Sequence, residues 1–401
     1  MGPSTPYRVI IAGAGVAAFE AALALRKLTE ERAAIVLVAP ESEFIYRPLA
    51  VAEPFRAGEV RRFPLSTLAE AAGAQLKCAS VSAVDAERRL VATADGARLS
   101  YDALLLALGA HPREAIPGAL TFRGPQDDAA LAALLHEATT GKIGKLVFAL
   151  PGGVTWPLPL YELALLTGIH LADAGAGGVE LEIVTPEAAP LELFGTAASE
   201  AIRELLEIRG IALRLQRTPV AVEDGTLRLV PEESIEASRV VALPRLEGPR
   251  LAGIPHDGEG FIRTDLHGRV ERVDDVWAAG DLTAFPVKQG GLAAQQADAA
   301  AESIAARAGA PVDPAPFKPI LRGLLLTGLA PRFLRTEFAV VSTADTEPLW
   351  WPPAKIVGRY LAPFLASHLG LSAAPPRVEG GKAVEIEVEL DPQRPGSWSD
   401  I

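Results

Sequence analysis

An apolar run, a glycine-rich turn and an amphipathic stretch follow one another directly at the start of the chain. Residues 8–12 read Arg-Val-Ile-Ile-Ala, residues 13–18 read Gly-Ala-Gly-Val-Ala-Ala, and apolar side chains then recur at helical spacing up to Leu28. A short apolar run suits a buried parallel strand, and the later period suits a helix. We therefore predict a strand, a tight turn and a helix that open a parallel α/β fold.

Small residues occupy the positions of this turn where a larger side chain would interfere. Gly13 permits the tight turn, Gly15 lets a ligand approach the backbone, and Ala18 lets the helix lie close to the strand. The open N–H groups at the start of the helix would then bind a diphosphate. A Gly-x-Gly-x-x-Ala pattern between a strand and a helix thus predicts a dinucleotide site.

Length, charge and cysteine content narrow the class of protein. A chain of 401 residues is too long to fold around a single hydrophobic core, so we expect two or three domains. Its net charge of −12 argues against an extended nucleic-acid surface. Cys78 is the only cysteine, so no disulfide and no pair of redox thiols can form within the chain. We expect Cys78 to behave as a small buried side chain.

We expect a cytoplasmic protein. The chain reaches its first strand within a few residues and shows no basic segment followed by the apolar core of a signal peptide. Its apolar runs fall short of the ~20 residues that a membrane span needs, which leaves peripheral membrane contact open. The six histidines are scattered without metal-ligand spacing, so no metal site is predicted.

The chain after the first helix supplies further strands and possible cofactor contacts. Residues 34–39 read as a second parallel strand, and Glu41 is the nearest acid to its end, where an acid would bind ribose hydroxyls. A solvated loop carboxylate explains Glu41 equally well. Arg47 and Pro48 follow in an aromatic segment. Next we expect a helix, a strand pair and a buried strand, over 65–72, 75–99 and 101–110, then a linker to about Pro125.

A second α/β unit is expected from about Lys145. Its strands are predicted at 146–150, 181–185, 211–215 and 239–243, with helices over 158–166 and 197–209. The turn after its first strand, residues 151–157, reads Pro-Gly-Gly-Val-Thr-Trp-Pro. Trp156 and the prolines add bulk where a pyrophosphate needs access to the backbone. The turn therefore argues against ordinary NAD(P) binding.

The chain then returns to the first unit and ends in a region of different character. Residues 276–281 are an expected strand ending in Gly-Asp, and a Gly-Gly pair precedes a helix over 292–308. Beyond a proline-rich linker, strands are expected at 321–326 and 338–341. The aromatic and basic residues 350–361 and the helix through Phe364 and Leu369 suit a lid, a membrane-facing surface or simple packing on the core.

Four elements, taken in this order, resemble the flavoproteins that have two dinucleotide-binding domains. They are the Gly13 turn, the strand ending at Gly109, the inserted second unit and the strand ending in Gly280-Asp281. Over roughly residues 7–310 the chain is most similar to the sulfide:quinone oxidoreductase and type II NADH dehydrogenase branch. Residues 288–296 and the aromatic-basic C-terminal part carry that closer similarity.

The resemblance implies an α/β fold with two Rossmann-like domains, one that binds FAD and one that resembles an NAD(P)-binding domain. The sheets of these domains would form three-layer ββα/βα arrangements. A C-terminal α+β segment follows them. We place the FAD-binding domain at 1–118 and 253–312, the second domain at 119–252 and the C-terminal segment at 313–401.

The resemblance also implies FAD as the cofactor and gives roles to particular residues. Asp281 would bind the ribityl or pyrophosphate part, and Val81 would lie near the adenine. The N–H groups at the start of the later helix would face the flavin's pyrimidine end, which is negative when reduced. The implied cofactor contacts are Gly13, Gly15, Val16, Ala17, Ala18, Glu41, Arg47, Pro48, Val81, Ala107, Leu108, Gly109, Gly280, Asp281, Lys288, Gln289, Gly290, Gly291 and Leu292.

The sequence assigns no catalytic side chain with certainty but supplies two candidates. Lys288 could stabilise reduced flavin or be a surface lysine, and Glu162 could relay protons beside Trp156 and Tyr161 or serve the core. By resemblance, the pair of glutamines at 295–296 would line a quinone site, although glutamines are also common on helix surfaces.

Three functions remain open at this point. The first is an FAD-dependent oxidoreductase that passes electrons to a quinone or similar small acceptor. The second is an NAD(P)H-dependent reductase of a soluble electron-transfer protein, and the third is a non-catalytic flavin-bearing subunit. The redox cysteine pair of the sulfide and disulfide enzymes is missing, so their chemistry is not expected. NADH would bind unusually, weakly or not at all, and a homodimer is left open.

Overall fold

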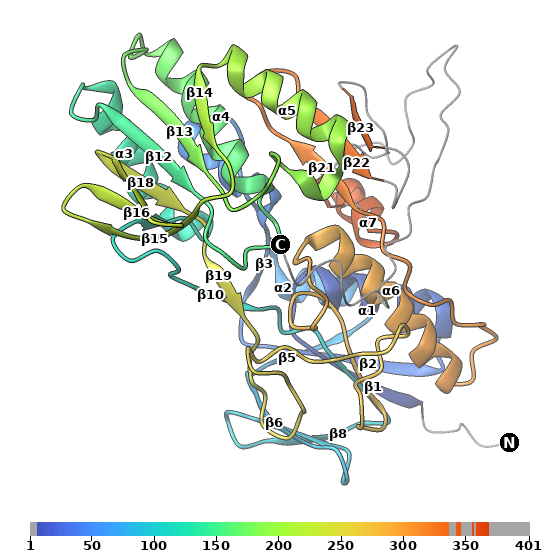
Figure 1. Cartoon of the computed structure of the whole chain (residues 1–401). Coiled ribbons are helices and arrows are strands. Elements are labelled where there is room, and N and C mark those ends of the chain that lie inside the picture. The colour runs from blue at the N-terminus through green and yellow to red at the C-terminus, as the bar shows by residue number, and fades with distance from the viewer. Residues whose placement is uncertain (1–5, 337–341, 346–354, 357, 369–401) are drawn as a thin grey trace, which may run out of the picture.

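A parallel sheet built around the first strand forms the centre of the FAD-like half. The structure, a computed structural model, describes residues 6–336, 342–345, 355–356 and 358–368 (Figure 1). In this sheet the strand order is β20-β9-β1-β2-β5 and every neighbouring pair is parallel. The strands are β1 (Tyr7–Ala12), β2 (Ala33–Ala39), β5 (Gln75–Cys78), β9 (Ala103–Leu106) and β20 (Val276–Ala278).

Both faces of this sheet are covered, which explains why β1 is apolar on both sides. Val9 and Ile11 pack against the helices α1 (Val16–Thr29) and α6 (Gly290–Arg307). Ile10 and Ala12 face the antiparallel sheet of β6 (Val81–Asp85), β7 (Leu90–Thr93) and β8 (Arg98–Ser100). The result is the expected ββα three-layer arrangement, and strands buried on both faces read as continuous hydrophobic runs.

A second parallel sheet repeats the arrangement in the other half of the molecule (Figure 1). Its order is β11-β18-β12-β13-β14, with bounds Leu120–Thr121, Arg239–Ala242, Lys145–Ala149, Glu180–Val184 and Ile211–Arg214. One face packs against α3 (Asp128–Thr139), α4 (Leu158–Asp173) and α5 (Thr196–Ile208). The other face meets the antiparallel strands β15 (Thr218–Glu223), β16 (Thr226–Val230) and β17 (Glu233–Glu236).

Shorter elements join and cover the two halves. The strands β10 (His111–Arg113) and β19 (Arg245–Glu247) pair antiparallel where the chain crosses between them. In the first half, β3 (Glu43–Tyr46) pairs with β4 (Arg61–Pro64), beside α2 (Leu65–Ala71). The 3₁₀ helices are η1 (Arg47–Phe55), η2 (Pro125–Asp127) and η3 (Glu192–Phe194).

The C-terminal segment is α+β, as expected. An antiparallel sheet of β21 (Arg322–Leu325), β22 (Arg332–Thr336) and β23 (Ser342–Asp345) precedes α7 (Leu361–His368). The strand expected at 338–341, residues 350–354 and 357 of the segment 350–361, and Leu369 lie outside the described residues.

Three details of the sequence interpretation are wrong. Residues 75–99 do not form a strand pair, because β5 joins the parallel sheet while β6, β7 and β8 form a separate one. Helix α3 and strands β15 to β17 were not expected at all. Cys78 is exposed rather than buried, since β5 is the edge strand of its sheet.

Two buried carboxyl groups join helices α1, α6 and α7. Glu20 of α1 accepts hydrogen bonds from the N–H groups of Tyr360 and Leu361, both at 2.7 Å, and so caps the start of α7. Asp298 of α6 hydrogen-bonds to Glu20, and burial together with the charge of Glu20 raises the pKa of Asp298 to about 9. Asp298 therefore holds a proton at neutral pH, and the shared proton removes the repulsion between the two acids.

We predict that Asp298→Asn flattens the pH dependence of stability. The folded chain keeps a proton on Asp298 between its ordinary pKa of 3.8 and about 9, while the unfolded chain releases it. The free energy of unfolding therefore falls as pH rises across that window. Asparagine still donates to Glu20 but does not titrate. Melting temperatures across the window should fall less steeply in Asp298→Asn than in wild type or in Asp173→Asn, an exposed control. Equal slopes would contradict the assignment.

Candidate functional site

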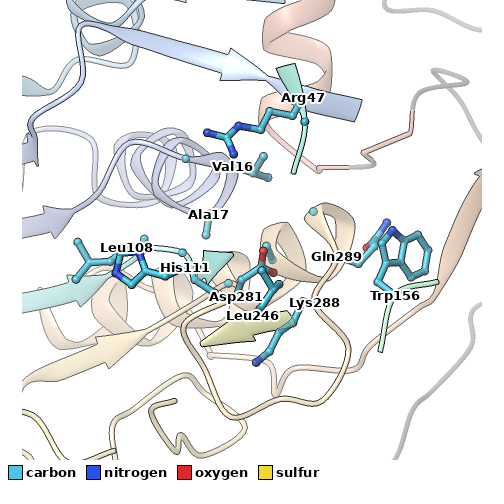
Figure 2. A pocket seen from close by; sticks show the side chains of 18 of the residues that line it. Val16, Ala17, Arg47, Leu108, His111, Trp156, Leu246, Asp281, Lys288 and Gln289 are labelled. Carbon is cyan, nitrogen blue, oxygen red and sulfur yellow. The ribbon is translucent and has the colours of Figure 1, made fainter. Parts of the chain in front are cut away.

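A large cavity lies where the two halves and the C-terminal segment meet. Its volume is about 1060 Å³. The β1–α1 turn, β3 and the start of α6 line it from the first half, and the start of α4 lines it from the second. Lys355 and Ile356 of the C-terminal segment close one end. The cavity therefore brings together residues that are far apart in sequence (Figure 2).

The two glycines of the β1–α1 turn serve different purposes. At Gly13, φ is +116°, and a Cβ atom would lie 2.2 Å from the carbonyl oxygen of Ala107. Gly13 is thus required by the backbone and by the neighbouring chain. At Gly15, φ is an ordinary −87°, and a Cβ would meet no atom within 4 Å, so it would project into open cavity space.

The start of α1 is open to the cavity. Gly15 provides no side-chain cap, and no acid stands in the first turn of the helix. The first N–H groups of a helix lack intrahelical partners and carry partial positive charge. Val16 and Ala17 line the cavity beside them, and Figure 2 shows the Arg47 side chain extending towards Val16. These residues fit a bound diphosphate, as FAD would provide.

Most of the residues predicted to contact FAD do line this cavity. They are Gly13, Gly15, Val16, Ala17, Glu41, Arg47, Pro48, Val81, Ala107, Leu108, Gly109, Gly280, Asp281, Lys288, Gln289 and Gly290. Ala18, Gly291 and Leu292 are buried and do not line it.

The start of α6 is less open than the sequence suggested. The Gln289 side chain caps the helix, because its Oε1 accepts the N–H of Leu292 at 2.8 Å. That N–H therefore has a partner within the chain. Gly290 does reach the cavity, where Ile356 packs so closely that a Cβ on Gly290 would lie 2.7 Å from it. The C-terminal segment thus rests directly on this helix start.

The Lys288 ammonium group is bound to the protein itself. It donates to the carbonyl oxygen of Thr283 and lies 3.8 Å from the centre of the Phe261 ring. Burial lowers the pKa of Lys288 to about 8, against the opposing effect of Asp281. Burial raises the pKa of Asp281, while Lys288 lowers it. Both side chains line the cavity, so Lys288 balances the charge of Asp281.

The glutamines suggested for a quinone site are structural. Oε1 of Gln296 accepts the N–H of Gly280 at 2.7 Å, which fixes the Gly280-Asp281 turn. Gln295 exchanges hydrogen bonds with the backbone of Ile320, at 3.0 and 2.8 Å. Neither side chain is among those lining the cavity. Both side-chain amides therefore have partners within the chain, and a role in a quinone site stays a prediction.

Glu162 reaches the cavity as half of a buried ion pair. Lys355 Nζ lies 2.6 and 2.7 Å from its two carboxylate oxygens, and the N–H of Leu326 donates to it at 2.9 Å. Burial raises the pKa of Glu162, against the lowering effect of Lys355. Trp156 lines the cavity as suggested, whereas Tyr161 is fully buried and donates to Glu187 instead.

Sequence reasoning missed several residues that line the cavity. Lys355 and Ile356 lay within the aromatic-basic segment flagged as a lid, but the partner of Lys355 could not be read from spacing. Glu20, which caps α7 and does not line the cavity, carried one signal, because it is an acid within an apolar stretch of α1. The remaining unforeseen lining residues include Ser80, His111, Arg123, Leu246, Asp257 and Phe261.

Neither a membrane-spanning helix nor a metal-binding cluster is found in the described part of the chain. Its helices are too short or too polar to cross a membrane. No grouping of histidine, cysteine, aspartate or glutamate there is arranged to hold a metal ion.

Comparison with known proteins agrees with the fold. The sequence model for pyridine nucleotide-disulphide oxidoreductases matches residues 7–303. A NADH dehydrogenase-like protein of Mycobacterium tuberculosis is 30% identical over 293 residues, covering 69% of this chain and 73% of that protein. A demethylphylloquinone reductase of Synechocystis is 27% identical over 300 residues, covering 68% and 71%.

Among solved structures, the sulfide:quinone oxidoreductase of Aquifex aeolicus is similar in fold. It superposes with a TM-score of 0.76 at 18% identity, over 85% of this chain and 87% of that one. At this identity the similarity shows a shared fold.

We predict that one added methyl group affects folding at Gly13 and FAD binding at Gly15. Gly13→Ala should lower the free energy of unfolding of the apoprotein by about 2 kcal/mol or more, because of its φ and the contact with Ala107. Gly15→Ala should change it by less than about 1 kcal/mol but weaken FAD binding about tenfold or more, since the methyl group enters the diphosphate space.

Urea denaturation of the apoproteins and flavin titration measure the two quantities. Tight FAD binding by Gly15→Ala would show that the diphosphate does not bind at this turn.

Proposed function

Because the chain belongs to the pyridine nucleotide-disulphide oxidoreductase family, we propose that it is an FAD-dependent oxidoreductase that passes electrons to a quinone or similar small acceptor. The oxidoreductase class and the FAD cofactor follow from the family. The acceptor rests mainly on one observation, the buried Glu162–Lys355 pair at the wall of the cavity.

The cavity residues provide a complete set of contacts for FAD. The open start of α1 would hold the diphosphate, with Gly13 and Gly15 giving access to the backbone. Val81 would lie by the adenine and Asp281 by the ribityl chain. The bound flavin supplies the redox chemistry, and the protein contributes position and electrostatics.

Glu162 and Lys355 suit the protonation of a reduced acceptor. A quinone that takes up two electrons also takes up two protons to become a quinol, so its site needs a proton donor. Burial raises the pKa of Glu162, so its carboxyl group holds a proton at higher pH than an exposed glutamate does. Lys355 Nζ, 2.6 Å away, donates a hydrogen bond to the carboxyl group and holds it in place at the cavity wall.

Two further facts support a quinone over a sulfur substrate. Cys78 is the only cysteine and lies exposed on β5, so the chain has no thiol pair to take up sulfur or reduce a disulfide. The Synechocystis relative is itself described as a demethylphylloquinone reductase. A soluble electron-transfer protein is the alternative acceptor.

Reoxidation of the reduced protein tests the proposal. The FAD-loaded protein is reduced with dithionite without oxygen and mixed with a water-soluble quinone, and the return of the flavin band is followed. Rapid return with quinone supports the proposal. Return only with a small iron–sulfur protein would favour the soluble partner, and no return with either would favour a flavin-bearing subunit. A protein that cannot be loaded with FAD would overturn the whole assignment.

We predict that Glu162→Gln slows quinone reduction by between about 10²- and 10⁴-fold, the usual contribution of a general acid. In wild type the rate should fall as pH rises through the raised pKa of Glu162, because the proton donor is lost. The variant should lose this pH dependence. Glu200→Gln, at an exposed site on α5, is the matched control and should behave as wild type.

The flavin spectrum and melting temperature show whether Glu162→Gln still folds around its cofactor, since the change leaves the Lys355 charge unpaired. A folded variant with an unaltered rate and pH profile would exclude Glu162 as the proton donor.

A further inference from the structure

We infer that the second Rossmann-like domain excludes nicotinamide dinucleotides, because residues 151–159, 216–218 and Arg245, together called the plug, occupy the positions that a dinucleotide would contact. The inference deepens the proposed function, on which it rests, by removing NADH and NADPH as electron donors. A dinucleotide must contact such a domain at three places, with its diphosphate, its adenosine ribose and its nicotinamide.

The diphosphate position at the start of α4 has fewer N–H groups to offer than the start of α1. Pro157 and Pro159 have no amide hydrogen, and the N–H of Leu160 already donates to the carbonyl of Pro157 at 2.9 Å. The Trp156 ring packs edge-to-face on Phe194, with centroids 5.8 Å apart, so its bulk is held in place. A diphosphate needs several such donors and a bare backbone. Here two prolines remove donors, and the fixed indole covers part of the backbone.

The position for the adenosine ribose is also occupied. In dinucleotide domains an acid after the second strand binds the ribose hydroxyls. The acid after β13 is Glu187, which is only 4% exposed and accepts hydrogen bonds from Tyr161 at 2.7 Å and Thr185 at 2.9 Å. Its carboxylate is therefore committed to the interior of the domain.

Residues 216–218 lie across the same crevice. The N–H of Gln216 donates to the carbonyl of Glu187, and that of Arg217 to the carbonyl of Thr185, both at 3.0 Å. The methyl group of Thr218 lies 3.3 Å from where a Cβ on Gly152 would stand. This stretch thus packs onto the turn after β12, at the place where the ribose would lie.

Contacts of Arg245 and Thr155 also cross the side of the domain where the nicotinamide would lie. The guanidinium of Arg245 lies over the turn, 3.3 Å from a Cβ position on Gly153, and pairs with Glu259 at 3.4 Å. The Thr155 hydroxyl donates to the carbonyl of Pro286 at 2.5 Å, which ties the second domain to the first. A nicotinamide ring passing between the domains would have to break both contacts.

The FAD-like half provides an internal comparison. Its turn has the same place in a similar fold, yet Gly15 faces open space and α1 begins uncapped. From the second domain, the cavity is lined by Phe122, Arg123, Gly124, Gly153, Val154, Thr155, Trp156, Leu158, Pro159, Glu162, Leu243, Pro244, Arg245, Leu246, Pro249 and Leu251. The second half therefore keeps the topology of a dinucleotide domain but has lost the binding surface.

An anaerobic titration of the FAD-loaded full-length protein tests the inference. NADH and NADPH are added up to about 1 mM, the upper end of ordinary KM values, and the visible flavin band is followed. We expect no bleaching, while dithionite bleaches the band fully. Calorimetry with NAD⁺ and NADP⁺ should show no binding in either FAD-loaded protein or apoprotein. Saturable bleaching or binding with any of these nucleotides would overturn the inference.

Opening the plug provides the complementary test. The triple variant Trp156→Gly, Pro157→Ala and Pro159→Ala restores the missing N–H groups and removes the indole. We expect NADH or NADPH to bleach its flavin at least about tenfold faster than in wild type, or NAD⁺ to bind measurably. A folded triple variant with no change would show that these residues do not form the barrier. Arg245→Ala is the milder second variant if the triple variant does not fold.

The two proposals fail in different experiments. Bleaching by NADH followed by reoxidation with quinone would overturn the plug and leave the quinone-reductase proposal in place. No bleaching by NADH, together with no reoxidation of the dithionite-reduced protein by quinone, would overturn the quinone proposal and leave the plug in place.

Discussion

The close contact between the Gly13 turn and the end of β9 is the constraint on which the site depends. Because Gly13 has no side chain, the carbonyl of Ala107 can approach to where a Cβ would stand. β1 and β9 can then pair in register through Ala12 and Leu106, and α1 begins directly above their ends. The uncapped N–H groups of α1 consequently face the cavity, which is the physical basis of the proposed FAD site.

Buried carboxylates connect the C-terminal segment to this frame. Glu20 on α1 caps α7, and Glu162 on α4 pairs with Lys355, so one segment is held by acids from both halves. Between these ties, Ile356 packs onto Gly290 at the start of α6. A buried acid without a partner would cost several kcal/mol, so each tie also strongly favours this one position of the segment. The cavity is closed at the same end that holds the proposed proton donor.

The two halves show how one topology can support different chemistry. Both contain a parallel sheet with helices on one face and an antiparallel sheet on the other. They differ in the turn after the first strand, where one half has glycines and an open helix start and the other has prolines and a fixed tryptophan. Fold alone therefore does not assign nucleotide binding, and the donors at the helix start decide it.

The sequence by itself determined the local elements and the fold class, because strand and helix periods and the Gly13-x-Gly15 spacing depend on neighbouring residues. Most of the cofactor contacts that it predicted do line the cavity, while the domain boundaries and the contacts themselves remain predictions. Only the tertiary structure decided the partners of the buried acids. Glu20 accepts a hydrogen bond from Tyr360 and Glu162 pairs with Lys355, although these partners are 340 and 193 positions apart in sequence. It also decided that Gln296 fixes a turn and that Cys78 is exposed, since such contacts and edges arise only when distant segments pack together.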